Sequence, residues 1–151
     1  MTDWGSVPVF GESITATPAA VRPSAYGIIN DADGRVAVVR APQGVFLPGG
    51  GSDADEAPES TIVREVREEC GLVVTVGRWR RAAIQRAFSR AEQAHFEKRS
   101  IFCNATVIGS GGEPTEDDHV LEWVPSAEAA SLLTDESHRW AIREWQELGE
   151  E

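Results

Sequence analysis

The feature that most constrains this chain is a glycine-rich turn that runs directly into a glutamate-rich segment. The sequence GGGSDADEAPESTIVREVREECGL begins at Gly49. Pro58 suits the first position of a helix and Gly71 suits the residue just past its end, so this spacing predicts a helix between them. Three glutamates would lie in the second half of that helix: Glu65, Glu68 and Glu69. Any fold for this chain must therefore accommodate three like charges close together.

The predicted helix has an apolar side and an acidic side. Because each residue turns the helix by about 100°, its apolar residues fall together: Ile62, Val63, Val66 and Cys70. The three glutamates form a continuous face beside them, where they repel one another and lie near the negative end of the helix dipole. Two interpretations stay open. The face is either solvated and paired with Arg64 and Arg67, or it binds a divalent cation, which prefers oxygen ligands.

Composition and charge limit the classes of protein to which the chain can belong. Its 151 residues, 41% of them hydrophobic, suffice for one domain with an ordinary core, and its formal net charge is −11. An acidic surface repels phosphate backbones, so we expect no nucleic acid polymer as a partner. We also expect no membrane partner and no signal peptide, since no apolar run is long enough. Two isolated cysteines, Cys70 and Cys103, indicate buried free thiols and a cytoplasmic location.

The whole sequence predicts one α+β domain over residues 23–151, preceded by an N-terminal arm or edge strand over residues 1–22. Strands are expected at 24–30, 35–40, 44–48, 72–79, 99–108 and 120–124, and 80–88 is expected to continue the strand at 72–79. The turn Asp31–Gly34 should join the first two as a hairpin, Gly49–Gly51 should be irregular, and 109–119 should be an acidic loop. Further helices are expected at 125–133, with Ser126 as N-cap, and at 135–148, with Trp140, Ala141, Ile142, Trp145 and Leu148 buried. The strands should form a mixed sheet flanked by helices.

The segment from Gly50 to Leu72 fits a known sequence pattern. The pattern is Gly-x5-Glu-x7-Arg-Glu-U-x-Glu-Glu-x-Gly-U, where U is a bulky aliphatic residue. Its nine specified positions are filled without a gap by Gly50, Glu56, Arg64, Glu65, Val66, Glu68, Glu69, Gly71 and Leu72. In this the chain resembles the Nudix hydrolases, and the order of its predicted elements is similar to the α/β/α sandwich of that family.

The resemblance implies an enzyme that hydrolyses a phosphoanhydride in a nucleoside diphosphate linked to another group. It implies a site for Mg²⁺ or Mn²⁺ formed by Glu65, Glu68, Glu69 and the carbonyl of Gly49. It further implies that Arg64 orients Glu65 through an ion pair with Glu56. The general base stays open between Glu68 and an acid of the later loop, where Glu116 is the candidate. Members of the family are often homodimers, so a homodimer is possible on this resemblance.

Two positions depart from the common pattern of the family. Asp55 stands where many members have Gly, and Ala57 stands where many have Ser just before the helix. An Ala cannot cap a helix, which costs about 1 kcal/mol, although Asp55 adds a favourable negative charge near the helix N-terminus. Neither residue is one of the catalytic carboxylates, so we expect activity to be retained.

Substrate contacts are indicated less strongly than the metal site. Candidates for the base or sugar are Tyr26, Phe46, Trp79, Arg81, Phe88 and Phe96, and candidates for a phosphate or sugar acid are Arg40, Arg86 and Lys98. An ordinary place in the core or on the surface is the alternative for each. By resemblance, a nucleoside diphosphate sugar ranks first, ahead of nucleoside triphosphates, including oxidised ones, and diadenosine polyphosphates. A non-catalytic nucleotide sensor usually lacks some of the glutamates, and a plain acidic interaction domain would not respond to divalent metal.

Overall fold

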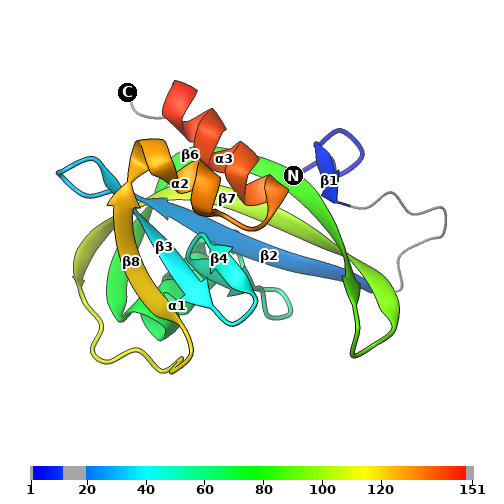
Figure 1. Ribbon diagram of the computed structural model, residues 1–151, viewed down its shortest axis with the longest axis horizontal. Coiled ribbons are helices and arrows are strands. Elements are labelled where there is room, and N and C mark those ends of the chain that lie inside the picture. The colour runs from blue at the N-terminus through cyan, green and yellow to red at the C-terminus, as the bar shows by residue number, and fades with distance from the viewer. Residues whose placement is uncertain (1, 12–19, 149–151) are drawn as a thin grey trace.

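A computed structural model describes residues 2–11 and 20–148 of the chain. Within these residues the strands are β1 (Val9–Gly11), β2 (Ala20–Ile29), β3 (Arg35–Ala41), β4 (Gly44–Phe46), β5 (Gly49–Gly51), β6 (Leu72–Ser89), β7 (Ala94–Ser110) and β8 (Val120–Pro125). The helices are α1 (Pro58–Cys70), α2 (Ser126–Leu132) and α3 (Glu136–Leu148). The strands form two sheets, with the orders β1-β6-β7-β2-β5 and β4-β3-β8 (Figure 1).

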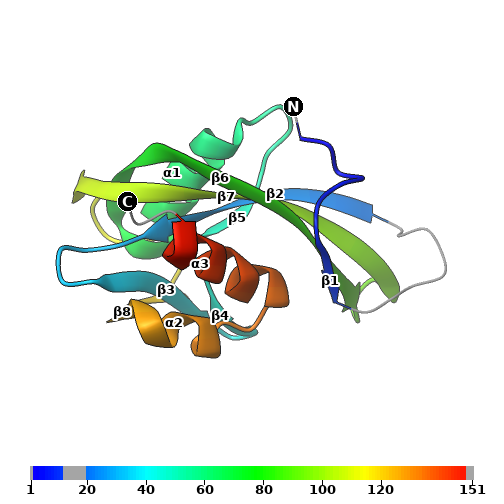
Figure 2. The same cartoon turned by 90° about the horizontal axis from the view of Figure 1, so that it is seen from above.

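The helices cover the larger sheet from both sides, so the predicted α/β/α sandwich is confirmed. Helices α1 and α3 lie on opposite faces of this sheet (Figure 2). Side chains alternate along β7, so Cys103 packs in one core cluster with Ile62 of α1, while Phe102 packs in the other with Ile142 of α3. All four side chains are fully buried, and each such aliphatic or aromatic group contributes about 1.5–3 kcal/mol to folding.

A long hairpin of β6 and β7 forms the centre of the larger sheet. The two strands pair from Leu72 opposite Ser110 to Ser89 opposite Ala94. The prediction that 80–88 continues the strand at 72–79 is confirmed, while β7 begins before the predicted 99–108. Strand β1 pairs in parallel with β6 at the sheet edge, as expected for part of the N-terminal segment. Strand β2 already begins at Ala20, inside the segment predicted as an arm.

The hairpin predicted from the turn at Asp31–Gly34 is wrong beyond that turn. The Asp31 carboxylate accepts the backbone N–H groups of Asp33 and Arg35, so the turn itself forms. Beyond one bridge between Asn30 and Val36, however, β2 and β3 separate into different sheets. The reason is that both edges of β2 are taken, one by β7 and the other by β5.

The glycine run at Gly49–Gly51 was expected to be irregular, and this expectation is wrong. These residues form β5, which pairs antiparallel with Ser24–Tyr26. Without side chains they fit closely between β2 and α1, and hydrogen bonds to β2 replace the packing that side chains would supply. The glycine turn is therefore a fixed part of the larger sheet, directly beside the glutamates of α1.

Helix α1 has the predicted ends, and Ile62, Val66 and Cys70 are buried as predicted, but the buried side extends further towards the glutamates. Pro58 begins it, Ala57 makes no side-chain cap, and Gly71 ends it in the left-handed conformation (φ 67°). Val63, expected in the core, is exposed, whereas Thr61 and Glu69 are buried. The buried side turns toward the glutamates because Thr61 and Glu69 make hydrogen bonds to the segment that follows β4.

The C-terminal part contains the two predicted helices, with one correction. Ser126 is not the N-cap of α2, because Pro125 occupies that position and the Ser126 N–H donates to the carbonyl of Gly34. In α3, Ala141, Ile142 and Trp145 are buried and Trp140 packs against the core, while the side chain of Leu148 lies outside the described residues. Among residues 2–11 and 20–148, no helix has the length and apolar character needed to cross a membrane.

Candidate metal centre and catalytic site

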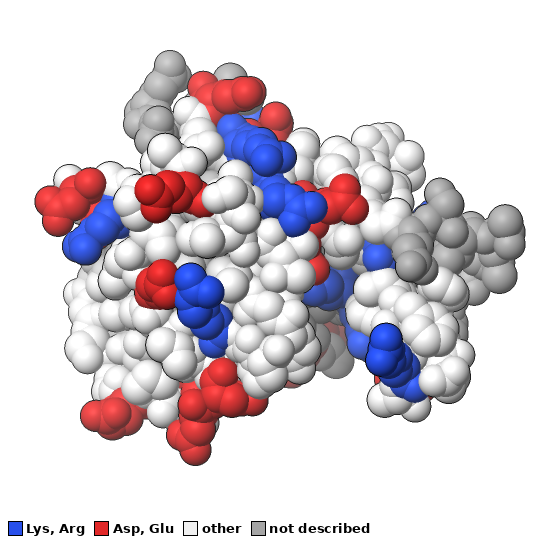
Figure 3. Space-filling model, viewed as in Figure 1, with Lys and Arg blue, Asp and Glu red and all other residues white. Residues whose placement is uncertain are grey.

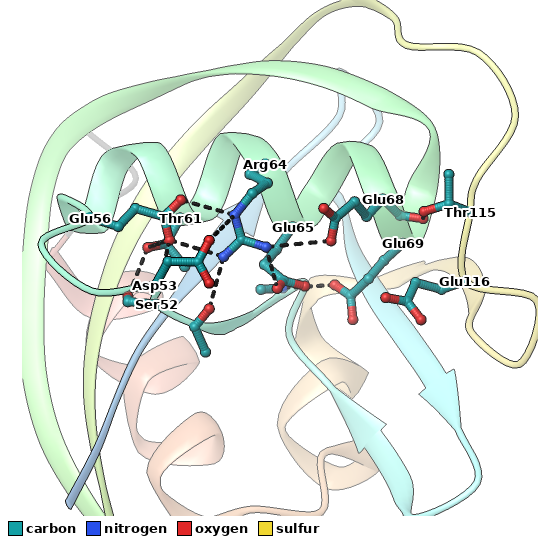
Figure 4. A network of polar contacts seen from close by, with 12 residues as sticks. Ser52, Asp53, Glu56, Thr61, Arg64, Glu65, Glu68, Glu69, Thr115 and Glu116 are labelled. Atoms are coloured by element: carbon teal, nitrogen blue, oxygen red, sulfur yellow. Dashed lines mark hydrogen bonds and ion pairs between the residues drawn. The ribbon is translucent and has the colours of Figure 1, made fainter.

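Arg64 is the centre of a carboxylate network on α1 (Figure 4). Its guanidinium binds both oxygens of Glu56: Nε donates to Oε2 and Nη2 donates to Oε1, each at 2.9 Å. Nη1 donates to Glu65 at 2.9 Å and to Glu68 at 3.4 Å. Nη2 also donates to the carbonyl of Gly51 at 2.9 Å. Because the guanidinium is planar and forked, one side chain holds several carboxylates at set angles. The ion pair expected between Arg64 and Glu56 is present.

Glu56 is held by groups that the sequence did not indicate. Its Oε1 accepts the backbone N–H of Asp53 at 3.0 Å and the hydroxyl of Thr61 at 2.7 Å. The Thr61 hydroxyl also lies 2.7 Å from that of Ser52. Arg64 is the main cause that lowers the pKa of Glu56 to about 2, and these hydrogen bonds add to the effect. Glu56 therefore stays ionised and fixes Arg64. The sequence feature that could have indicated this hydrogen bond is a Thr on the helix, five residues after Glu56.

Glu69 is a buried carboxylate, only 8% exposed, that depends on a single backbone donor. The N–H of Gly49 donates to its Oε1 at 2.9 Å. Burial is the main cause that raises the pKa of Glu69 to about 8, and nearby carboxylates, Glu65 foremost, contribute to the same rise. Among the described residues no Arg or Lys pairs with it, and the Nε2 of His119 lies 3.9 Å from Oε2. The protein's own cations therefore do not stabilise the ionised form of Glu69, and a divalent cation would.

Glu65 packs directly against the glycine turn. A Cβ added to Gly50 would lie 2.8 Å from Cδ of Glu65, so any side chain there would displace the carboxylate. Gly49 has φ +149°, and a Cβ on it would lie 2.2 Å from the carbonyl oxygen of Ala25. Burial raises the pKa of Glu65, against the opposite effect of Arg64. These two glycines are thus required for the close approach of β5 to both β2 and the glutamates.

The acidic loop between β7 and β8 docks on the C-terminal end of α1. The N–H groups of Thr115 and Glu116 both donate to the carbonyl of Glu68, at 2.8 and 3.2 Å. Carbonyls at a helix end lack partners within the helix, so the loop satisfies one of them. The docking brings the Glu116 carboxylate beside that of Glu69 (Figure 4), and Glu116 contributes to the raised pKa of Glu69.

His119 was not among the predicted site residues. Its Nδ1 lies 3.2 Å from Asp118 and 3.6 Å from Glu116. Glu116, Asp118 and His119 are the described residues whose metal-binding atoms all lie within 4.8 Å of one another. The helix glutamates are arranged differently, because Glu65 and Glu68 each direct one oxygen to Arg64. The residues that could hold metal therefore come from both α1 and the docked loop.

A cavity of about 170 Å³ opens beside Glu69, and we call it the Lys98 cavity. The predicted substrate residues that line it are Tyr26, Phe46 and Lys98. Gly49, Glu69 and His119 line it as well. The other candidates do not line it: Arg40, Trp79, Arg81, Arg86, Phe88 and Phe96. Arg40 instead pairs with Glu122 at 2.6 Å, and Arg81 with Glu144 at 3.4 Å. Three of the nine substrate-contact candidates thus line the cavity beside Glu69, and six do not.

The surface carries charges of both signs. The chain has 25 acidic and 14 basic residues. On the face in Figure 3, basic side chains of the described residues are interspersed with acidic ones, and several of them lie between the upper centre and the lower right.

Comparison with known proteins identifies the family. The model of the NUDIX domain matches residues 20–146, which include the glycine turn, the glutamates of α1 and the docked loop. The chain belongs to the Nudix family. Members of this family are typically metal-dependent phosphoanhydride hydrolases.

Relatives of known name are distant. The "Putative 8-oxo-dGTP diphosphatase 3" of Mycobacterium tuberculosis is 31% identical over 107 residues, which are 68% of this chain. The match spans only 45% of that relative's own length. The MutT protein of Methanosarcina mazei Go1 superposes with a TM-score of 0.65 at 18% identity, over 90% of this chain and 100% of that one. A Nudix hydrolase of Nitrosomonas europaea gives a TM-score of 0.61 at 14% identity, over 83% and 88% of the two chains. At these identities the solved structures establish the Nudix fold.

Proposed function

We propose that this Nudix protein hydrolyses the phosphoanhydride of a nucleotide with Mg²⁺ or Mn²⁺ bound at the α1 glutamates. The observation that carries the proposal is the buried carboxyl group of Glu69, which has no Arg or Lys partner among the described residues. It lies beside Glu65 and Glu116, while Arg64 is already engaged with Glu56. Ionising this group inside the folded protein costs free energy, and a bound divalent cation would offset that cost.

The metal ligands in this proposal are Glu65, Glu68, Glu69 and the carbonyl of Gly49. When bound, the metal neutralises the pyrophosphate and lowers the pKa of a bound water. The chain itself contributes position: Arg64 keeps Glu65 and Glu68 in place, and the Gly49 N–H holds one oxygen of Glu69. Phosphoryl transfer depends mainly on such positioning and charge neutralisation.

For the general base we favour Glu116 over Glu68. The Glu68 carboxylate directs one oxygen to the Arg64 guanidinium at 3.4 Å, so Arg64 already occupies that oxygen. Glu116 is held by its backbone N–H on the helix end, and its carboxylate has only His119 as an ion-pair candidate among the described residues. It is thus placed to accept the proton of an attacking water at the metal centre.

Two substrate classes enter the proposal. The sequence ranks a nucleoside diphosphate sugar first. The name of the M. tuberculosis relative, an 8-oxo-dGTP diphosphatase, favours a nucleoside triphosphate, including oxidised ones. Both contain the pyrophosphate that the metal centre would bind, and they differ in the group attached to it. A diadenosine polyphosphate is the third candidate.

The remaining proposals concern organisation and location. We propose that residues 23–151 act as one catalytic domain, and that β1 and the first residues of β2, from the segment 1–22, complete its larger sheet. We also propose that the protein is a homodimer, which light scattering would measure. Cys70 and Cys103 are free and buried, which supports a reducing, cytoplasmic setting.

The test is turnover of a substrate panel: UDP-glucose, ADP-ribose, GTP, 8-oxo-dGTP and diadenosine tetraphosphate, with Mg²⁺ or Mn²⁺. Product release is compared between the wild type, Glu69→Gln and Glu59→Gln. Glu59 is an exposed glutamate of the same helix that pairs with Arg80, so its variant controls for loss of a helix charge. We expect turnover that Glu69→Gln abolishes and Glu59→Gln leaves unchanged. No turnover of any substrate, or an active Glu69→Gln, would contradict the proposal.

A further inference from the structure

The Lys98 cavity has opposite charges on its two sides. Glu69 lines it at the metal centre, and the Lys98 ammonium lines it from β7. Lys98 lies near two aromatic rings of the same wall, with Nζ 5.7 Å from the ring centre of Tyr26 and 5.9 Å from that of Phe46. At about 170 Å³ the cavity is below the usual size of a whole-ligand site, so it suits one small group attached to the pyrophosphate.

Lys98 keeps its charge in this half-buried position because of two partners. Nζ donates to Asp135 Oδ2 at 3.1 Å and to the hydroxyl of Tyr26 at 3.4 Å. Burial works against the ammonium, but Tyr26 and Asp135 outweigh it, so the pKa of Lys98 lies above its ordinary value. An ammonium has three N–H donors. Two are used among the described residues, and one is left for a group in the cavity.

Asp135 lies in the segment that leads into α3. The same helix also binds the segment that contains Leu47 and Gly49. The Asp135 backbone carbonyl accepts the N–H of His138, while its carboxylate reaches Lys98. The buried ring of His138 accepts the N–H of Leu47 at Nδ1, at 3.1 Å. Leu47 lies two residues before Gly49, whose N–H binds Glu69. The start of α3 thus holds both the Lys98 ammonium and the strand that supports the metal centre.

We infer that Lys98 selects substrates whose group beyond the metal-bound pyrophosphate is anionic, and that Asp135 is the residue that positions Lys98 for this contact. The inference rests on the proposed function and names its substrate class. A neutral sugar would leave the free N–H of Lys98 with an uncharged acceptor. An anionic oxygen would accept a charge-assisted hydrogen bond, which is roughly twice as strong as a neutral one. The anion is either the terminal phosphate of a triphosphate or the carboxylate of a sugar acid.

The first experiment measures binding, so that it does not depend on turnover. Calorimetry with Mg²⁺ compares α,β-methylene-ATP with α,β-methylene-ADP, which lacks the terminal phosphate. The variants are Lys98→Met and Asp135→Asn, and Arg35→Met is the control because it removes an exposed, ion-paired cation at the β2–β3 turn. We expect Lys98→Met to weaken binding of the triphosphate analogue about tenfold and to change the affinity for the diphosphate analogue little. The control should change neither affinity.

The second experiment separates the two sources of negative charge. Hydrolysis of UDP-glucuronic acid and of UDP-glucose is measured beside that of GTP for each variant. Selection of a terminal phosphate predicts a raised KM for GTP in Lys98→Met, whereas selection of a sugar carboxylate predicts it for UDP-glucuronic acid. The control Arg35→Met should leave the kinetic constants of all three substrates near their wild-type values.

The role of Asp135 has its own test. If Asp135 acts through Lys98, Asp135→Asn should raise KM for the same charged ligand. The double variant Lys98→Met/Asp135→Asn should then have a KM for that ligand no higher than that of Lys98→Met alone. A purely structural Asp135 would weaken charged and neutral ligands alike, which would overturn that part. If Lys98→Met loses affinity equally for both methylene analogues, the proposed selection by Lys98 is overturned. Charge-selective binding without any turnover would instead refute the proposed hydrolase activity and leave this inference standing.

Discussion

Replacing Glu69 by Gln should stabilise the metal-free protein and remove its response to metal. Burial raises the pKa of Glu69 from 4.5 to about 8 in the folded state. A raised acid pKa makes the folded state bind its proton more tightly. The resulting stability is therefore full below the unfolded value of 4.5 and is lost as pH rises toward 8. Gln has no charge to desolvate, and its carbonyl can still accept the N–H of Gly49.

The size of this effect follows from the shift. Near pH 7 the unfolded side chain is ionised and the folded one is still protonated, which costs roughly 3 kcal/mol at about 1.4 kcal/mol per pKa unit. Since one kcal/mol moves the melting temperature of a domain of this size by about 2–4 °C, Glu69→Gln should melt roughly 5–10 °C higher in EDTA. The gain should vanish near pH 4.5, where both states hold the proton.

The assay is thermal unfolding followed by circular dichroism, over a pH series, with EDTA or with Mg²⁺. Metal binds only the folded state in this reasoning, so it should raise the wild-type melting temperature as its concentration rises. Glu69→Gln should lose most of that rise, and Glu59→Gln should keep it. A Glu69→Gln protein that melts below the wild type in EDTA at neutral pH, or that gains as much from Mg²⁺, would refute the reasoning.

Three further outcomes are expected. Gly50→Ala should lower kcat about a hundredfold, since its Cβ would lie 2.8 Å from Cδ of Glu65. Gly51→Ala, whose Cβ meets nothing within 4 Å, should be nearly silent in the same turnover assay, and equal losses would contradict this. Arg64→Lys should destabilise the fold by about 2–3 kcal/mol in urea unfolding, because an ammonium cannot replace the fork; a change below about 0.5 kcal/mol would count against the network. His138 has its pKa lowered by burial to about 3, so folding stability is lost as pH falls below the ordinary value of 6.5. Between about pH 7 and pH 5, His138→Gln should remove about 2 kcal/mol of the loss in the free energy of unfolding, measured with Mg²⁺ present. If the variant and the wild type lose the same free energy over this range, the reasoning is contradicted.

Much of the fold was predictable because it depends on short-range pattern. The ends of α1 follow from Pro58 and Gly71, and the strand at 120–124 and the C-terminal helix follow from periodicity. The errors share one cause, which is that pairing partners far apart in sequence decide where an element belongs. The turn at Asp31–Gly34 forms locally, yet β2 leaves β3 because β7 and β5 occupy its edges. Gly49–Gly51 looks irregular alone and becomes a strand only beside β2.

The candidate site divides in the same way. The sequence by itself determined that Glu65, Glu68 and Glu69 share one helix end, because neighbours three and four apart lie on one face of any α-helix. Only the tertiary structure decided that Glu69 is buried, that Glu116 reaches it through the docked loop, and that Asp135 binds Lys98 at the cavity wall. These contacts join segments many residues apart, and their geometry depends on how sheet, helix and loop pack rather than on any local preference.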